Sequence, residues 1–343
     1  MLTFPPSSPL DQMAGLPAVT RARGLISGLI RQMSIEAVKG GRLQARPRLL
    51  HRPDPSPAWG RARFVGCHVD DYLTHGNAVH LVTSRHASTG LPASAMWIPA
   101  VELGVTDERR YGGKLRYWWG GVELPINDVV HVARGADPRM PVRGLGVIEQ
   151  HLTTWQRLTK QANAESDAYD HSGVPSVAVI TPNADLSPAD AAEAKASWME
   201  KFQRREPVIL PTGTEVKPLA WSPVDSQMVE AREMSLKDVA NAFGMDGAWL
   251  GASTKGLTYK SIGPLFLGLV RETIEPVSDD FEQIWGESWL PWGTELQFTK
   301  SDILTDDLPT EMSWIGDAVD KKIITPEEGR TRLGYSKMEE TNV

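Results

Sequence analysis

The 343-residue sequence lacks the features that mark secreted and membrane proteins. It contains one cysteine, Cys67, so an intrachain disulfide is impossible. No apolar run approaches the roughly 18 residues that a membrane-spanning helix requires, and the first residues do not follow the charged, apolar and small-residue order of a secretory signal. The hydrophobic share of 41% and the charged share of 23% are ordinary for a globular chain. We therefore expect a globular protein of cytoplasmic origin, with one large or several smaller domains.

An excess of basic charge is also missing. The chain has 36 lysines and arginines against 43 aspartates and glutamates, which gives a net charge of −7. A protein that grips duplex DNA neutralises its phosphates with Lys and Arg, so this balance argues against tight, specific DNA binding. A channel along which DNA slides needs only weak contact. The charge is compatible with such a conduit but does not point to one.

Motifs for phosphate binding and nucleophilic catalysis are absent as well. No Gly-x-x-x-x-Gly-Lys-Ser/Thr segment is present, and the stretch from Gly251 to Gly256 has its glycines and lysine in the wrong spacing. The Gly-x-Ser-x-Gly pattern of serine hydrolases is missing too. No motif surrounds Cys67, which we expect to be a buried, inert thiol. We therefore predict no enzymatic activity and no cofactor.

One group of side chains suggests metal chemistry. A divalent-metal hydrolase needs several nitrogen and oxygen ligands close together, and residues 68–80 supply candidates. We keep this hydrolase as the alternative function, although no further set of ligands follows at a suitable spacing. The simpler interpretation, which we favour, places these side chains on a surface helix and a strand edge. The residues are His68, Asp70, Asp71, His75 and His80.

The first sixty residues predict a helix and a linker. Apolar residues recur at spacings of three and four between Leu16 and Met33, with three arginines off that face, which indicates a packed helix. Prolines then interrupt regular structure and favour an extended connection. These are Pro47, Pro53, Pro55 and Pro57.

Short apolar runs separated by glycine and proline between Phe64 and Val132 favour a small β-sheet. The segment Val65–Thr74 is compatible with a helix instead. The predicted strands are Val79–Val82, Met96–Ile98, Leu115–Trp119 and Val129–Val132.

The pattern then changes to long helices. One is predicted from Gly144 to about Ser172, and a second from Asp225 to Phe243, after which glycines prevent continuation. Between them lies a compact α/β module with Ser187 as the N-cap of its helix. Its strands are predicted at Ser176–Ile180, Val208–Leu210 and Val216–Trp221.

The clearest apolar stripe runs from Ile262 to Trp285. Pro276 removes a backbone hydrogen bond inside this helix, so we predict a kink near Glu272 and Thr273. Farther along, Thr325 and Glu328 form a capping box around Pro326. The tryptophans are predicted to pack in the core or at subunit interfaces rather than to bind ligands. The most clustered are Trp118, Trp119, Trp285, Trp289 and Trp292.

Several short segments occur in an order that is more specific than any one of them. Val239–Met245 reads Val-Ala-Asn-Ala-Phe-Gly-Met and precedes Trp249-Leu250-Gly251 and Thr258-Tyr259-Lys260-Ser261. Before it come Arg48–Asp54, Gly76-Asn77-Ala78 and Pro125–Val132, and after it comes Thr325-Pro326-Glu327-Glu328 with Arg330. From Leu16 to Gly334, this order resembles the portal proteins of long-tailed bacteriophages. Val79 and Glu327 depart mildly from the family's tyrosine and asparagine.

The resemblance implies an α+β portal fold that assembles as a ring. It has a β-rich wing, long stem helices, a small α/β clip insertion and a kinked wing helix. The implied regions are an N-terminal helix and linker (1–60), wing (61–143), stem helix (144–172), clip (173–222), stem helix (223–244), tunnel loop (245–261), kinked wing helix and following segment (262–300), and C-terminal or crown segment (301–343).

The resemblance also implies a function. About twelve subunits would form a channel at one capsid vertex, through which double-stranded DNA is packaged and ejected. The implied partners are further copies of the chain, DNA, the terminase large subunit, the major capsid or scaffold protein and a head–tail adaptor protein, without a membrane. The protein would be assembled in the bacterial cytoplasm and reside in the virion. An infectious phage, a prophage remnant and a gene-transfer particle all remain open as its setting.

Candidate site residues follow from the same resemblance. Lys255 and Lys260 are expected to approach phosphates weakly and without reading bases, although an ordinary exposed loop remains the alternative. In the clip, Arg204 and Arg205 are candidates for docking a partner. The full expected tunnel-loop set is Ser253, Thr254, Lys255, Gly256, Thr258 and Lys260.

Overall fold

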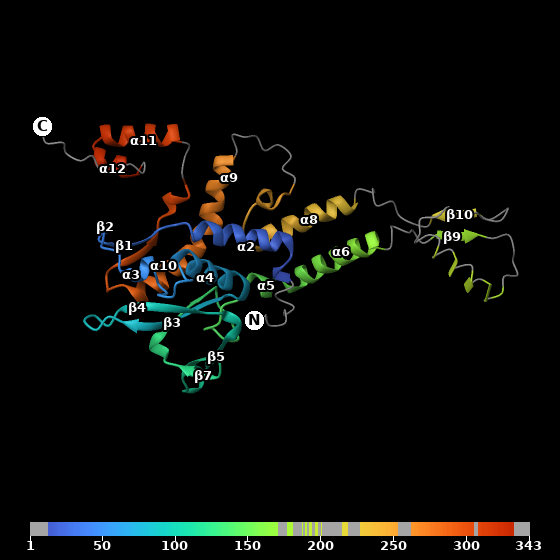
Figure 1. Ribbon diagram of the computed structural model, residues 1–343, viewed down its shortest axis with the longest axis horizontal. Helices are drawn as coiled ribbons and strands as arrows, with labels where there is room; N and C mark the ends of the chain where they lie inside the picture. The colour runs from blue at the N-terminus through green and yellow to red at the C-terminus, as the bar shows by residue number, and fades with distance from the viewer. Residues whose placement is uncertain are drawn as a thin grey trace. The chain divides into compact units, whose positions relative to one another are not determined.

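The computed structural model describes most of the chain in two compact units. The described residues are 13–170, 177–180, 187, 189–190, 192–193, 196–197, 200, 215–218, 227–252, 262–304 and 308–332. Unit 1 comprises Met1–Trp155 and Leu236–Val343, and unit 2 comprises Gln156–Ser235. Both helices and strands are present (Figure 1), as the sequence predicts.

Unit 1 contains most of the regular structure. Its helices are α2 (Pro17–Ile30), α3 (Arg48–His51), α4 (Arg61–His75), α5 (Val147–Gln150), α9 (Ile262–Leu269), α10 (Glu275–Trp289), α11 (Leu308–Asp320) and α12 (Pro326–Arg332). Its strands are β1 (Ile35–Lys39), β2 (Arg42–Leu43), β3 (Asn77–Arg85), β4 (Pro92–Ile98), β5 (Leu103–Asp107), β6 (Leu115–Trp119), β7 (Val122–Leu124), β8 (Val129–Ala133) and β11 (Glu295–Phe298). Two further helices, α6 (Leu152–Asp170) and α8 (Gln227–Ala242), cross the boundary between the units.

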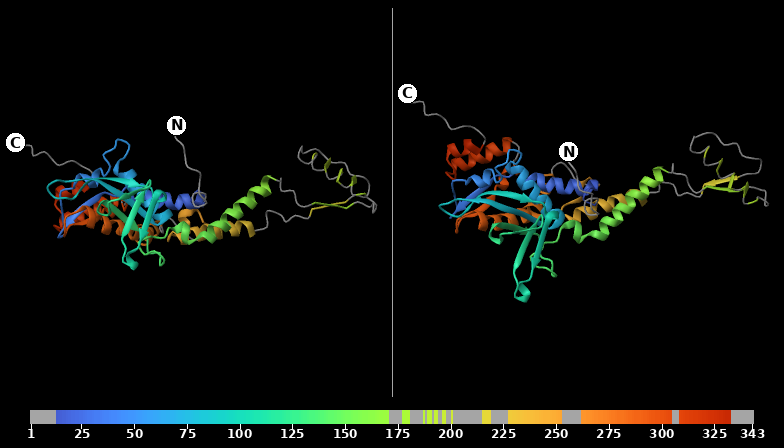
Figure 2. Two further views of the ribbon diagram at one scale, coloured as in Figure 1. Left: turned by 90° about the horizontal axis from the view of Figure 1, so that it is seen from below. Right: turned by 60° about the horizontal axis from the view of Figure 1, so that its bottom comes forward.

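The described residues of unit 1 form three antiparallel sheets, with strand orders β11-β1-β2, β4-β3-β8 and β5-β6-β7. The third projects from the second (Figure 2). Buried side chains from both sheets meet where they join, and each buried apolar side chain of this size stabilises the fold by about 1.5–3 kcal/mol. They are Val79, Ile98, Tyr117 and Leu124.

Helix α4 lies at the centre of the main core. It packs against α2, whose buried face repeats at the spacing that the sequence indicates: Val19, Ala22, Ile26 and Ile30. On another side its aromatic residues meet α10. Phe64 lies 5.9 Å from Trp285 between ring centroids, and Tyr72 lies 5.3 Å from Phe281. The helical alternative for Val65–Thr74 is therefore confirmed.

The kink predicted from Pro276 takes the form of one π-helical stretch, Val270–Ile274, between α9 and α10. A proline ring collides with the carbonyl four residues earlier, here that of Glu272. A wider turn at this point relieves the collision. Thr273, inside the stretch, donates its hydroxyl proton to the carbonyl of Gly244 and so ties the kink to the end of α8.

The chain enters α5 by crossing closely over the end of α4. A Cβ placed on Gly146 would lie 2.0 Å from the carbonyl oxygen of Thr74, and one on Gly144 would lie 2.0 Å from that of Gly76. Asn77 links the two segments, accepting from the Gly144 amide at 2.8 Å and donating to the His75 carbonyl at 2.6 Å. Only glycine fits this crossing.

Several details differ from the sequence expectations. The helix expected from Gly144 begins at Val147 and is interrupted at His151, because Gly144–Gly146 make the crossing instead. Cys67 is half-buried rather than buried. Trp285 and Trp289 stack in the core at 4.6 Å, which confirms the core packing predicted for them, whereas Trp292 is 99% exposed in the turn before β11, so core packing is excluded for this residue in the protomer. Strands β1, β2, β5, β7 and β11 were not predicted.

Unit 2 contains a two-stranded antiparallel sheet of β9 (Val177–Ile180) and β10 (Glu215–Pro218). These strands confirm two of the three expected in the inserted module; the third, Val208–Leu210, lies outside the described residues. Ser187 accepts from the Asp190 amide at 3.2 Å, which confirms the predicted N-cap.

Candidate functional site

The His68–His80 segment does not form a metal centre. His68 and His80 are fully buried, so the surface placement favoured from the sequence is wrong for them. They belong to a chain of hydrogen bonds that ends on Trp289. The distances are 3.0 Å from Trp289 Nε1 to His80 Nε2, 3.1 Å from His80 Nδ1 to His68 Nε2, and 2.7 Å from His68 Nδ1 to the carbonyl oxygen of Phe64.

The indole fixes the direction of this chain. Because Trp289 can only donate, His80 Nε2 accepts, and the proton of His80 sits on Nδ1. His80 then donates to His68 Nε2, and His68 donates from Nδ1 to the Phe64 carbonyl. Burial lowers the pKa of His68 to about 3 and the pKa of His80 well below its usual value. Every ring nitrogen is used, and none remains for a metal.

The neighbouring carboxylates are engaged as well. Asp70 forms an ion pair with Arg23, and Asp71 accepts hydrogen bonds from Trp97 Nε1 and the Ala100 amide, both at 3.0 Å. Burial raises the pKa of Asp71 to about 7. His75 is the last residue of α4. Across the described ranges, no three His, Cys, Asp or Glu side chains are grouped to hold a metal ion. The hydrolase alternative therefore loses its site.

The segment that carried the strongest sequence motif forms a well-defined end to α8. Gly244 adopts a left-handed conformation with φ of 67°. The Met245 amide donates to the Ala240 carbonyl at 3.0 Å, and the Gly244 amide to that of Asn241 at 3.2 Å. This is the Schellman arrangement that ends a helix at glycine. Phe243 and Met245 are buried, which anchors the turn in the core.

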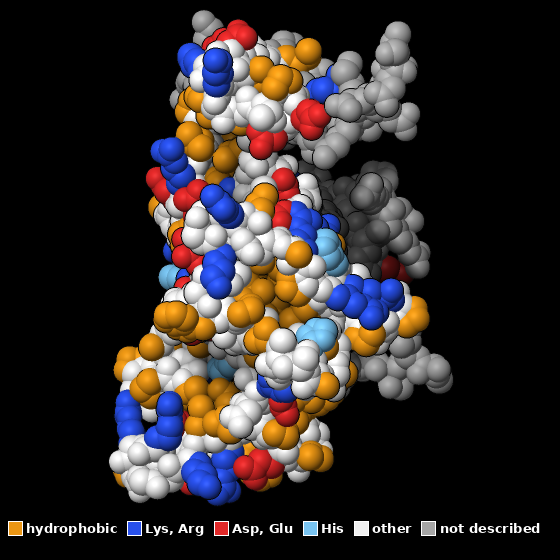
Figure 3. Space-filling view, turned by 90° about the vertical axis from the view of Figure 1, so that its left-hand side faces the viewer, with side chains coloured by type: hydrophobic (Ala, Val, Ile, Leu, Met, Phe, Trp, Pro, Cys, Tyr) orange, Lys and Arg blue, Asp and Glu red, His pale blue; other side chains and the backbone are white. Residues whose placement is uncertain are grey.

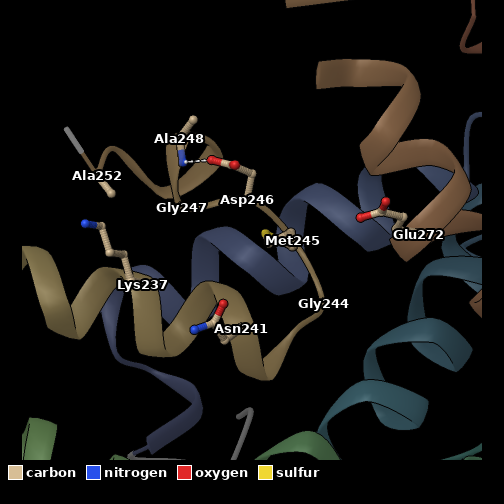
Figure 4. Close-up of a pocket in the computed structure, with 9 residues that line it drawn as sticks. All are labelled: Lys237, Asn241, Gly244, Met245, Asp246, Gly247, Ala248, Ala252 and Glu272. Carbon is tan, nitrogen blue, oxygen red and sulfur yellow. Dashed lines mark hydrogen bonds between the residues drawn. The ribbon is translucent and has the colours of Figure 1, made fainter. Parts of the chain in front are cut away.

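A cavity of about 660 Å³ lies beside this turn (Figure 4). Lys237 and Asn241 line it from α8, and Glu272 lines it from the π-helical stretch. Asp246 caps the short turn Gly247–Leu250 by accepting from the Ala248 amide at 2.8 Å. The remaining lining residues are small or apolar: Gly244, Met245, Gly247, Ala248 and Ala252.

This arrangement offers a recess with charged side chains at its border. It contains one lysine and two carboxylates but no cysteine, serine or histidine among its lining residues. Sequence reasoning missed it, although the Asp246-Gly247 capping signal at the start of the short turn could have indicated ordered structure here. The expected tunnel-loop residues Ser253, Thr254, Lys255, Gly256, Thr258 and Lys260 follow directly, and they lie outside the described residues. Arg204 and Arg205 do so too.

On the face shown in Figure 3, lysines and arginines are interspersed with acidic and apolar side chains rather than gathered into one basic surface. No helix in the described part of the chain is long and apolar enough to cross a membrane.

Comparison with known proteins identifies the family. The sequence profile of the family described as phage portal protein matches residues 17–334. The chain belongs to the phage portal protein family. Portal proteins are structural components of one capsid vertex, and this is the role that membership gives the chain, in agreement with the resemblance seen in its sequence. A search of curated proteins finds no match.

Solved portal structures share the fold. An HK97-family phage portal protein from Corynebacterium diphtheriae is 20% identical, with a TM-score of 0.65, over 87% of this chain and 97% of that one. A chain from the neck of an empty gene transfer agent particle, computed with C6 symmetry, is 19% identical, with a TM-score of 0.64, over 96% and 93%. A chain from the neck of the native particle, computed with C12 symmetry, is 19% identical, with a TM-score of 0.61, over 95% and 92%.

Proposed function

We propose that about twelve copies of this portal protein close into a ring around a channel at one capsid vertex, and that double-stranded DNA enters and leaves through it. The observation that carries the proposal is the family match over residues 17–334. Two similar chains belong to particle necks computed with C6 and C12 symmetry, which supports a ring. A head-to-tail interface closes into a ring when the rotation between subunits divides a full turn.

In this proposal, the parts of the chain have separate tasks. Residues 61–143 and the kinked helix of 262–300 form the wing, residues 144–172 and 223–244 form the stem, and residues 173–222 form the clip. The proposed clip, residues 173–222, falls within the compact unit Gln156–Ser235, which supports a clip that is distinct from the wing. The segment 301–343 forms the crown.

The tunnel loop, residues 245–261, is proposed to face the DNA. It starts at the turn that ends α8, which is fixed in the core by Phe243 and Met245. Lys255 and Lys260 would then contact phosphates weakly, as a sliding duplex requires. Replacing both lysines with alanine should leave the ring intact and alter DNA packaging or retention. Loss of the ring in this variant would instead make the loop an assembly element.

The partners follow from the same role. The terminase large subunit is proposed to dock on the clip and to supply the energy of packaging, and a head–tail adaptor protein later to occupy the same surface. Arg204 and Arg205 are the clip residues proposed for this contact. The capsid or scaffold protein would surround the wing. The protein is assembled in the host cytoplasm and remains in the virion.

The first test is the assembly state of the purified full-length protein. Multi-angle light scattering should give a mass of about twelve or thirteen subunits, and negative-stain images along the axis should show a ring with an open centre. Co-expression with its scaffold or capsid protein is the second arm, because assembly can need a template. A monomer or dimer under both conditions would refute the proposed ring.

A further inference from the structure

Helix α9 is unusual because it is apolar on all sides and yet incompletely buried. Its sequence from Ile262 to Leu269 contains no charged or hydrogen-bonding side chain. Leu269 and the following Val270 are buried, and Phe266 packs on Trp249 with 6.0 Å between ring centroids. Leu267, by contrast, is 37% exposed. A helix without a polar face is normally covered, so part of its cover is missing from the described protomer.

The exposed side of this helix continues into one basic residue. Arg271 follows Leu267 by four positions, which places both on one face of the helix, and it is exposed. Among the described residues, the structure records no ion pair or hydrogen bond for Arg271. The face therefore presents an apolar side chain with a guanidinium beside it, and arginine is enriched among the residues that contribute most to binding at protein interfaces.

The other side of the same helical segment borders the cavity described above. Glu272 is one of its lining residues, and none of the lining residues belongs to α9 itself. Five residues separate Leu267 from Glu272, which rotates their side chains by about 110–140° around the axis when the wider π turn is included. We call the exposed side chains of Leu267 and Arg271 the knob, and the cavity beside α8 the recess. The knob and the recess therefore face different directions.

The recess is complementary to the knob in size and in charge. Small residues, including Gly247, Ala248 and Ala252, border a volume that can receive a leucine side chain. Asp246 and Glu272 contribute two carboxylates against the single ammonium group of Lys237, an excess of negative charge that suits an arginine. Figure 4 shows the Glu272 side chain directed toward the recess. A knob and a complementary recess on different faces of one chain create a head-to-tail contact.

We propose that Leu267 of one subunit inserts into the recess beside α8 of the next subunit, and that Arg271 pairs there with the carboxylates of Asp246 and Glu272. The proposal rests on the ring described under Proposed function and names a contact that holds it. The occupant of the recess is thus a second copy of this chain. The recess is lined in part by residues 245–252, so this contact involves the first residues of the proposed tunnel loop.

Disulfide trapping tests the contact directly. Cys67 is the only cysteine, so a Cys67→Ser background carries no other thiol. In that background, Leu267→Cys combined with Ala248→Cys should give, under mild oxidation, a ladder of covalent oligomers up to the full ring on a denaturing gel. Each single cysteine variant should give no ladder. A double variant that stays monomeric on the gel, while the native protein is a ring by negative stain, overturns the proposal and leaves the ring itself intact.

Charge reversal provides an independent test. Arg271→Glu should reduce the ring population by about tenfold or more, because one altered surface is repeated at every interface. Arg271→Glu combined with Glu272→Arg restores one of the two proposed charge pairs and should recover part of the lost assembly, because the Asp246 carboxylate stays in the recess. Unchanged assembly in the single variant, or no recovery in the double variant when circular dichroism shows a folded chain, overturns the ion pairing.

A matched apolar control separates a specific contact from general stickiness. Leu43 in β2 is 70% exposed and is the same residue type. Leu267→Asp should abolish the ring, whereas Leu43→Asp should retain it. Equal loss in both variants would show that assembly depends on total surface hydrophobicity. Failure of the unaltered protein to form a ring in any condition would instead refute the proposed function.

Discussion

Replacing Gly146 with alanine should destabilise unit 1 more than almost any other single-methyl change. The added Cβ would lie 2.0 Å from the carbonyl oxygen of Thr74, 2.5 Å from its carbonyl carbon and 2.8 Å from the amide nitrogen of His75. Real contacts of this type are at least about 3 Å, so one backbone segment must move by about 1 Å. The atoms in the way are backbone, which cannot rotate aside as a side chain can.

The surrounding hydrogen bonds set the magnitude. Asn77 holds the Gly144 amide at 2.8 Å, and the Arg134 amide donates to the Gly76 carbonyl at 2.8 Å, so a shift at Gly146 strains several bonds at once. Overpacking of a rigid site costs typically 1–3 kcal/mol, and we expect about 3 kcal/mol here. For a unit of this size, that lowers Tm by roughly 6 °C or more.

Thermal and urea unfolding of Gly146→Ala should be compared with Gly24→Ala. Gly24 is exposed within α2, and a Cβ there meets no atom within 4 Å. Alanine in a helix interior is favoured over glycine by about 0.5–1 kcal/mol, so the control should be slightly stabilised. A Gly146→Ala protein as stable as the parent would refute the close crossing over α4.

Four further predictions concern other parts of unit 1. Trp289→Phe should cost about 1–3 kcal/mol in urea unfolding because His80 Nε2 loses its buried donor; an unchanged midpoint would contradict the directed chain. Burial lowers the pKa of His68 to about 3, so on acidification this residue is protonated in the unfolded chain at a higher pH than in the folded chain. The free energy of unfolding should therefore fall by about 2 kcal/mol between pH 7 and pH 5 because of His68. The pKa of Asp71 is raised to about 7, so the folded chain takes up this proton first and gains stability between pH 7 and pH 5. Asp71→Asn should therefore increase the loss of unfolding free energy over this pH range by about 2 kcal/mol. An equal pH dependence of stability in parent and variant would exclude the raised pKa. Thr325→Ala removes the acceptor for the Glu328 amide and should speed hydrogen exchange across α12 by about fivefold, corresponding to about 1 kcal/mol, with no change in α2.

Local patterns predicted the elements that local forces determine. The spacing of apolar residues gave α2, Pro276 gave the position of the kink, and Thr325 with Glu328 gave the start of α12, where both reciprocal hydrogen bonds are present. Each signal acts within one or two helical turns. Tertiary packing did not need to be known.

Strand pairs that join distant parts of the chain were missed. β1 pairs Ile35 with Phe298 across more than 260 residues, and each strand is only four or five residues long. A run this short gives little periodic signal, and its partner cannot be inferred from local sequence. The same applies to the recess beside α8, whose wall at Glu272 comes from a separate helix.

The histidine segment shows a different kind of error. His68 lies four residues after Phe64 and four before Tyr72, so the helical period alone places it on the apolar face of α4. Residue type suggested a ligand or a surface position, whereas the period indicated burial. The decisive partner, Trp289, is 209 residues from His80 and could not be identified from the sequence.

In the protomer, one set of buried polar groups at the centre is paired in a fixed direction, from Trp289 through the two histidines to the Phe64 carbonyl. At the edge, Leu267 is partly exposed and Arg271 has no recorded partner among the described residues. A hydrogen-bond network whose donors and acceptors all find partners within one chain contributes to the stability of that chain. Side chains that find their partners only on a neighbouring subunit contribute to assembly. Trp289→Phe should therefore lower the unfolding midpoint of the subunit and leave the ring geometry unchanged, whereas Arg271→Glu should change the assembly and leave the midpoint of the isolated subunit unchanged.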